Sequence, residues 1–65
     1  MAMSPTTIYS LAQVSLILKQ LRADYESSRR YCEEHGKTNG VTFNNGRVTS
    51  IDEAIRLVEQ AITSK

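Results

Sequence analysis

The sequence predicts a mainly α protein of the small α+β type: a long N-terminal helix, a short β-hairpin, a short C-terminal helix, and a helical core completed by oligomerisation. Three observations predict this fold class. Residues 6–35 contain neither Gly nor Pro, two Asn-Gly pairs follow at 39–40 and 45–46, and an apolar pattern with helical spacing resumes after Ser50. At 65 residues, the chain is expected to form one small domain, 1–65.

The first helix is predicted over residues 5–35. Ser4 is a suitable N-cap, and Pro5 then falls at the first helical position, where a missing N–H costs nothing. Gly36 provides a C-terminal stop. A helix of this extent is about 45 Å long at 1.5 Å per residue, which is long for so small a chain.

The two halves of this helix differ. Leu11, Val14, Leu18, Leu21, Tyr25 and Cys32 follow 3–4 spacing along its whole length. In residues 8–21 further apolar side chains point almost all round the axis, and a helix that is apolar all round is buried all round. We therefore expect the N-terminal half to form an oligomer interface. Its predicted residues are Ile8, Leu11, Val14, Ile17, Leu18 and Leu21.

The middle segment, residues 40–49, is predicted to form a β-hairpin. Asn-Gly is the strongest short hairpin signal, because a type I′ turn needs positive φ at both central residues. With Asn45-Gly46 as the turn, strand alternation places Val41, Phe43 and Val48 on one face. An irregular loop is the alternative, since a lone two-stranded ribbon is marginal unless it packs on a helix.

The second helix is predicted over residues 51–63. Ser50 and Glu53 have the spacing of a capping box, and Ile51, Ile55 and Val58 begin an apolar face. A helix of this length, about 20 Å, covers under half of the first helix. The uncovered remainder predicts a homodimer or higher oligomer with a four-helix core.

Composition supports the same expectation. A chain this short buries only about 60% of its unfolded surface and needs a disulfide, a metal or oligomerisation. Cys32 is the only cysteine, and one Cys with one His is too few for a closed zinc site in one chain. Cys32 and His35 could form a metal site only if a two-fold axis doubled them; a half-buried thiol beside a helix-end histidine is the alternative. No cofactor or metal is expected.

Charge and the N-terminal pattern limit the expected partners and cellular location. A net charge of +1 argues against a dedicated nucleic-acid binder. The N-terminus lacks the basic region and cleavage site of a secretory signal, and no apolar run approaches the roughly 18 residues of a membrane span. A lone cysteine fits a reducing compartment, so a cytoplasmic location is expected.

One mixed cluster is the candidate contact site for a partner or ligand. It consists of Tyr25, Arg29, Arg30, Tyr31 and Arg47. Arginine beside tyrosine suits a phosphate, a nucleotide or nucleic acid bound between protomers, and in that interpretation Arg22 joins the cluster. Acidic residues interleave with the arginines, however, and a solvated, salt-bridged face is the alternative.

These features together predict a non-enzymatic, homo-oligomeric protein-binding module. It would act as an adaptor, inhibitor or accessory factor of a larger protein, as small phage and mobile-element proteins often do. The order helix, hairpin, helix is similar in layout to the small head–tail joining proteins of tailed phages, although the first helix is much longer than theirs. A structural component of a larger assembly is a further alternative.

Overall fold

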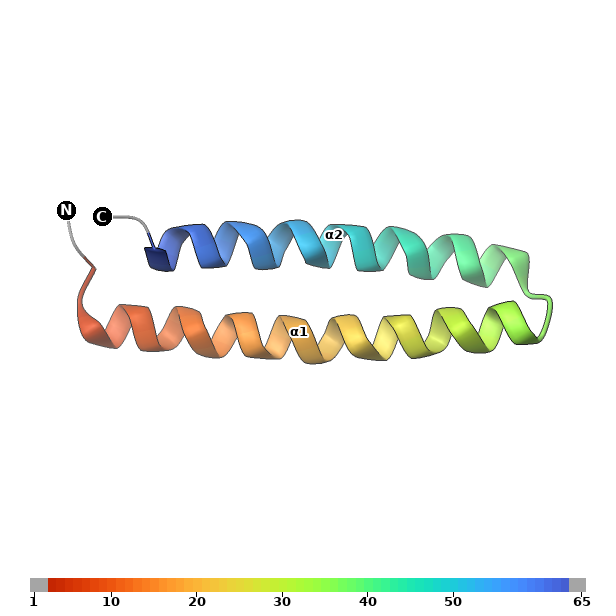
Figure 1. The fold of residues 1–65 in the computed structure, drawn as a ribbon, viewed down its shortest axis with the longest axis horizontal. Helices are drawn as coiled ribbons and strands as arrows, with labels where there is room; N and C mark the ends of the chain where they lie inside the picture. The colour runs from red at the N-terminus through yellow and green to blue at the C-terminus, as the bar shows by residue number, and fades with distance from the viewer. Residues whose placement is uncertain (1–2, 64–65) are drawn as a thin grey trace.

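The computed structural model describes residues 3–63, which form two α-helices packed side by side in an antiparallel hairpin (Figure 1). Helix α1 spans Pro5–Glu34 and helix α2 spans Thr38–Thr63. The molecule measures 50 × 14 × 10 Å between Cα atoms. Its radius of gyration is 15.1 Å, whereas about 11 Å is expected for a compact domain of this length. The fold is therefore a thin rod.

Helix α1 begins where the sequence predicts it and ends at Glu34, one residue before the predicted end. The Ser4 hydroxyl accepts a hydrogen bond from the backbone N–H of Thr7 at 3.2 Å, and Pro5 opens the helix. At the other end, Gly36 has a φ of 68°. The N–H of Gly36 donates to the carbonyl of Glu33, and that of Lys37 to the carbonyl of Cys32. This pair of bonds is a Schellman motif, which ends the helix and reverses the chain.

The predicted β-hairpin is wrong. Residues 40–49 are helical, and no strand occurs within residues 3–63. Helix α2 starts at Thr38, so Ser50 lies inside it and does not cap it. The similarity in layout to the head–tail joining proteins depended on the hairpin, so the structure does not support it.

The physical reason lies in what each conformation can pair and bury. A lone ribbon leaves both its edges without backbone partners, whereas a helix satisfies its backbone internally. As a helix, this segment also places Val48 and Asn44 against α1, where both are buried. Tertiary packing therefore overrides the weak helix propensity of Asn, Gly and Thr.

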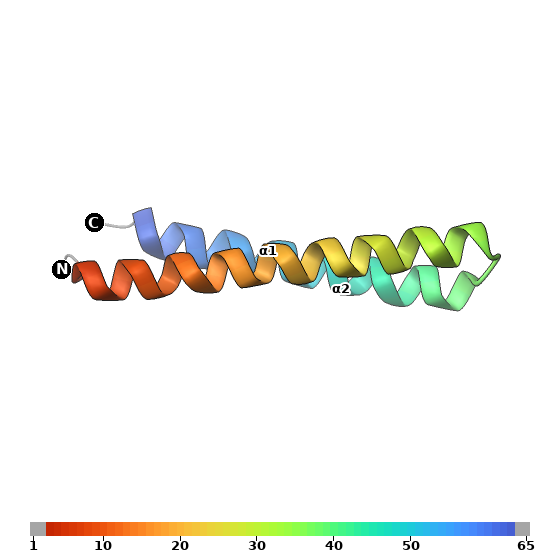
Figure 2. The same cartoon turned by 90° about the horizontal axis from the view of Figure 1, so that it is seen from below.

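The two helices meet along one continuous seam. On each helix the inward positions alternate in steps of three and four, which is the heptad spacing of a coiled coil. On α1 these positions are Leu11, Ser15, Leu18, Arg22, Tyr25, Arg29 and Cys32; on α2 they are Val41, Asn44, Val48, Ile51, Ile55, Val58 and Ile62, all buried or half-buried. The shallow crossing in Figure 2 agrees with this repeat.

The seam is a thin core. Its best-buried hydrophobic residues are Val48, Ile51 and Ile55, each 8–9% exposed, and Ser15 and Asn44 are the buried polar residues. Because α2 runs alongside most of α1 (Figure 1), the length mismatch inferred from the sequence does not exist. A different feature leaves α1 uncovered: one partner helix can bury only one stripe of a helix that is apolar all round.

Candidate interaction surface

Apolar side chains remain exposed on one flank of the seam. We call this flank the apolar side and define it by the exposed Val14, Ile17, Leu21 and Leu57 and the half-buried Ala54 and Ala61. Heptad geometry places all six on the same flank, because 14, 21, 54 and 61 adjoin the seam and 17 and 57 lie one step further out. Ile17 is 61% exposed and Leu57 is 52% exposed. Such a run on a small protein indicates an association surface.

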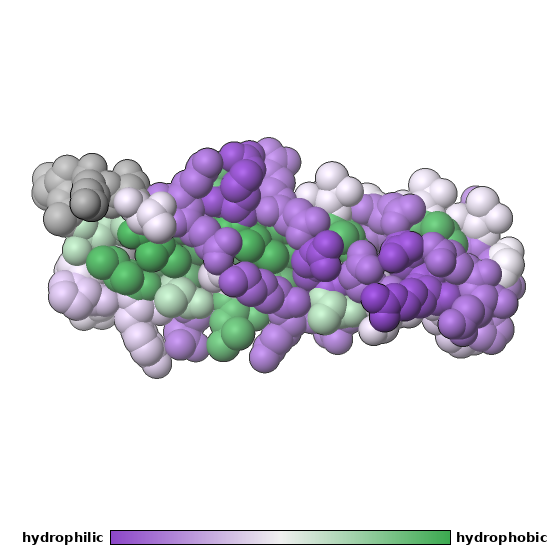
Figure 3. Space-filling view, in the orientation of Figure 1, coloured by the Kyte–Doolittle hydropathy of each residue, from purple (hydrophilic) through white to green (hydrophobic). Residues whose placement is uncertain are grey.

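The exposed hydrophobic residues concentrate at the open end of the hairpin, where the chain termini lie. Figure 3 shows the broad face opposite the apolar side, where hydrophobic side chains gather over the open end and hydrophilic ones over the turn end. On α1 the exposed large hydrophobic residues are Ile8, Tyr9, Val14, Leu16, Ile17, Leu21 and Tyr31. Since Leu16 lies on the flank opposite Val14, the first half of α1 does present apolar surface on both sides of the seam.

The structure divides the predicted interface residues into two sets. Leu11 and Leu18 are half-buried in the seam within the hairpin. Ile8, Val14, Ile17 and Leu21 are exposed and available to another chain. The contribution of α2 to this surface, Ala54, Leu57 and Ala61, was missed. The sequence does carry a signal for them. Ala54 and Ala61 are seven residues apart, Leu57 lies three residues after Ala54, and all three adjoin the stripe of Ile51, Ile55 and Val58.

The opposite flank of the seam is charged. Lys19 pairs with Glu59 at 3.0 Å, and Arg22 pairs with Asp52 across the two helices. The Ser15 hydroxyl also donates to Glu59, at 3.5 Å. The hydrogen bond to Asp52 raises the pKa of Arg22 further above its ordinary value. Exposed pairs of this kind add little stability each. The helices are held together mainly by the buried seam residues Val48, Ile51 and Ile55.

The predicted arginine–tyrosine cluster is only partly available for binding. Arg29 is half-buried and donates to both Glu26 and Glu33 on its own helix. Tyr25 is half-buried in the seam. Arg30, Tyr31 and Arg47 are exposed, and the Arg47 guanidinium lies 5.0 Å from the centre of the Phe43 ring. With Arg22 and Arg29 engaged by carboxylates, the salt-bridged face describes this part of α1 better than a phosphate pocket.

Acid should weaken the hairpin through Glu26. The hydrogen bond from Arg29 lowers the pKa of Glu26 below its ordinary value of 4.5. The unfolded chain therefore binds this proton first, so the contribution is fully present above about pH 4.5 and is lost as pH falls through the lowered pKa. In thermal melts, the Tm of Glu26→Gln should therefore fall less between neutral and acid pH than the Tm of the wild-type chain. Glu34→Gln is the control, because exposed Glu34 forms no ion pair within residues 3–63.

Aromatic and cationic groups meet at the turn. The Tyr31 and His35 rings stack with centroids 4.0 Å apart, and the Lys37 ammonium lies 5.4 Å from the Tyr31 ring centre. Cys32 is half-buried, and its sulfur lies 4.0 Å from the Asn44 side-chain nitrogen. Residues 3–63 contain no group of three potential metal-ligating side chains. The turn thus presents exposed aromatic surface rather than a ligand cage.

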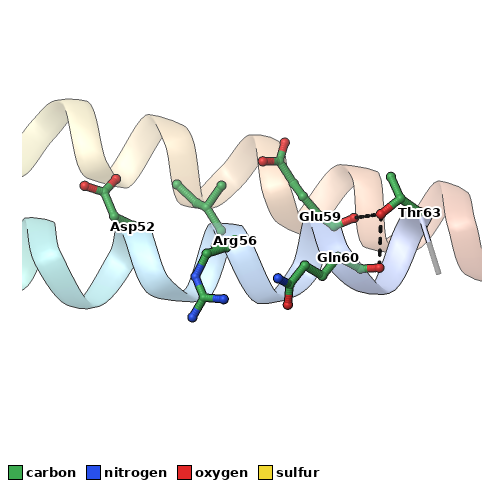
Figure 4. A pocket seen from close by; sticks show the side chains of 6 residues that line it. Asp52, Arg56, Glu59, Gln60 and Thr63 are labelled. Carbon is green, nitrogen blue, oxygen red and sulfur yellow. Dashed lines mark hydrogen bonds between the residues drawn. The ribbon is translucent and has the colours of Figure 1, made fainter.

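The hollows on the surface are shallow. One lies on α2 alone, between Asp52, Arg56, Glu59, Gln60 and Thr63 (Figure 4). The Thr63 hydroxyl bonds back to the carbonyls of Glu59 and Gln60, at 3.1 and 3.2 Å, so it is engaged by its own helix. Because one helix forms the whole hollow, its side chains cannot converge on a substrate from several directions.

Comparison with known proteins returns no relative. No protein-family model matches the chain, and no curated protein or solved structure matches it either. Within residues 3–63, neither helix contains an apolar stretch long enough to cross a membrane.

Proposed function

We propose that the chain is a non-enzymatic protein-binding module, an adaptor or accessory factor that works by helix–helix association. The observation that carries this proposal is the unfilled apolar surface: within residues 3–63 no side chain is fully buried, while nine large hydrophobic residues are exposed. The accessible surface is 4863 Å², against about 4,200 Å² for a compact chain of 7.3 kDa. Packing against other helices would complete the core.

Two regions serve the proposed binding. The apolar side at the open end supports association with apolar helices. The exposed side chains toward the turn, Arg30, Tyr31 and Arg47, support contact with a larger protein, since tyrosine and arginine dominate the energetics of many interfaces.

A phosphate-containing ligand or nucleic acid is the second candidate. It is favoured by one observation: within residues 3–63, Arg30 and Arg47 form no ion pair, although five such pairs occur elsewhere. The Arg30 guanidinium, next to exposed Tyr31 in the sequence, would suit a phosphate and a stacked base. This binding would weaken steeply with salt, whereas an apolar protein interface would not.

Affinity capture from a host extract at low and high salt tests the proposal. The wild-type chain should retain a protein partner at both salt concentrations. An Arg30→Ala variant, which leaves the apolar side unchanged, should lose that partner. The control is Thr49→Ala, a substitution at an exposed position of α2, which should keep the partner. Capture of nucleic acid that disappears at high salt would favour the second candidate. The proposal would be overturned if the wild-type chain captured no more protein than the Arg30→Ala variant.

A further inference from the structure

We propose that a second copy of this chain covers the apolar side, through a two-fold axis parallel to the long axis of the hairpin. The result is an antiparallel four-helix bundle with both turns at the same end. This inference rests on the proposed function and names the partner of the apolar side.

The register within one hairpin is fixed by contacts across the seam. Ser15 bonds to Glu59, Arg22 bonds to Asp52, and Cys32 lies beside Asn44. On the apolar side this register sets Val14 level with Ala61, and Leu21 level with Ala54. At each of these two levels, a large residue on α1 lies beside an alanine on α2.

Shape favours the axis parallel to the hairpin. That axis places α1 of one copy over α2 of the other at the same level, so Val14 faces Ala61 of the second copy and Leu21 faces Ala54 of the second copy. Large residues then fill the space over small ones, as packed helices require. Ile17 meets Leu57 of the second copy. Every facing pair of helices is also antiparallel, as in an up-and-down four-helix bundle.

The turn half of the flank matches under the same axis. Tyr31 is level with Phe43, and both are more than half exposed, at 53% and 56%. The two-fold axis brings Tyr31 of one copy over Phe43 of the other, which adds an aromatic contact to rings that already meet His35 and Arg47 of their own chain. The apolar and aromatic rows thus each meet a complement.

An axis perpendicular to the hairpin gives a poorer match. It places α1 over α1 and α2 over α2, with turns at opposite ends. The alanines of α2 then face one another and leave space, while the large residues of α1 crowd together. Centring that axis on the apolar open ends also moves Tyr31 and Phe43 away from the second copy.

The area of this face approaches that of a standard interface. The broad face of the hairpin is 50 Å long and 14 Å wide between Cα atoms, which is a footprint of roughly 700 Å² per copy. A standard protein–protein interface buries about 800 Å² per partner. A dimer would therefore use most of this face.

Mass and distance together test this arrangement. Sedimentation equilibrium should give the mass of two chains. For the distance, a Cys32→Ala, Asn39→Cys variant carries one nitroxide near the turn. Pulsed dipolar spectroscopy should find the two labels within roughly 30 Å, because the turns are neighbours. Turns at opposite ends would lie about 45 Å apart or more, the length of α1.

A charge on the apolar side provides the matched variants. Ile17→Asp should weaken the dimer on the order of 100-fold, since it buries a carboxylate between apolar helices. Gln20→Asp adds the same charge at an exposed position of α1 outside the apolar side, and should leave the dimer unchanged. If Ile17→Asp fails to fold, the label distance in the otherwise native sequence still decides.

The outcomes separate the two proposals. A two-chain mass with a short label distance supports the bundle, and a long distance overturns the parallel axis. A monomer overturns self-association through this flank. A mass of more than two chains overturns the two-chain bundle. Protein capture by the wild-type chain remains a separate readout, so a module that binds a foreign partner as a monomer would still be recognised.

Discussion

Leu18→Asp is expected to unfold the hairpin. Leu18 occupies a half-buried seam position on α1, at about the level of buried Ile55 on α2. The nearest seam cation, Arg22 one turn away, is already paired with Asp52. A carboxylate at position 18 would have to compete for it, and burying that carboxylate costs several kcal/mol, roughly. Small domains have only about 5–15 kcal/mol of stability in total. Circular dichroism with urea titration should show most helical signal lost at low denaturant.

The control for Leu18→Asp is Gln13→Asp. It introduces the same charge into the same helix, at an exposed position away from the seam. Its free energy of unfolding should change by no more than about 0.5 kcal/mol, as for most surface substitutions. Equal stability of the two variants would mean that Leu18 is not a seam residue and that α2 does not pack on this stripe.

The first helix is predictable because its signals are local. Ser4, Pro5 and Gly36 act through the chemistry of their own backbone and nearest neighbours, whatever the rest of the chain does. The structure confirms each of them, and places the helix end at Glu34, one residue before the predicted one. The distribution of apolar side chains around the axis in residues 8–21 is also predictable, because it follows from helix geometry alone.

The second helix is not predictable in the same way, because its first half is held by tertiary packing. The local signals, Asn39-Gly40 and Asn45-Gly46, favour turns. The opposing signal is the heptad spacing from Val41 to Ile62, and it is masked because one of its positions is Asn44. That residue is accommodated as a buried polar group: its amide donates to the carbonyl of Gly40 at 2.8 Å.

Sequence alone also cannot assign a stripe to its partner. Leu11 and Val14 both belong to apolar stripes of the first helix, yet one faces the seam and the other the apolar side. The choice depends on which stripe α2 occupies, and that is decided by packing between the two helices, which no local signal in either helix specifies. The arginines illustrate the same limit, since Arg29 and Arg30 are neighbours in sequence with different surroundings.

Gly40→Ala and Gly46→Ala are expected to change stability in opposite directions. Both glycines are helical, and Gly36 is the glycine with positive φ. At Gly46 an added Cβ meets nothing within 4 Å, so alanine should stabilise the protein by about 1 kcal/mol through helix propensity. At Gly40 the added Cβ would lie 2.5 Å from the Cys32 sulfur and 3.3 Å from its Cβ. The resulting overpacking should cost about 1–3 kcal/mol.

The sign of the Gly46 effect separates a helix from a turn, because a type I′ turn at Asn45-Gly46 needs positive φ and alanine would then destabilise it. For Gly40, adding Cys32→Ala removes the sulfur and should restore much of the lost stability. Urea unfolding of the two single variants and the double variant measures this coupling. Additive effects would show that the turn ends of α1 and α2 do not approach as closely as the Cys32–Gly40 contact requires, whereas strong coupling would place the start of α2 against the end of α1.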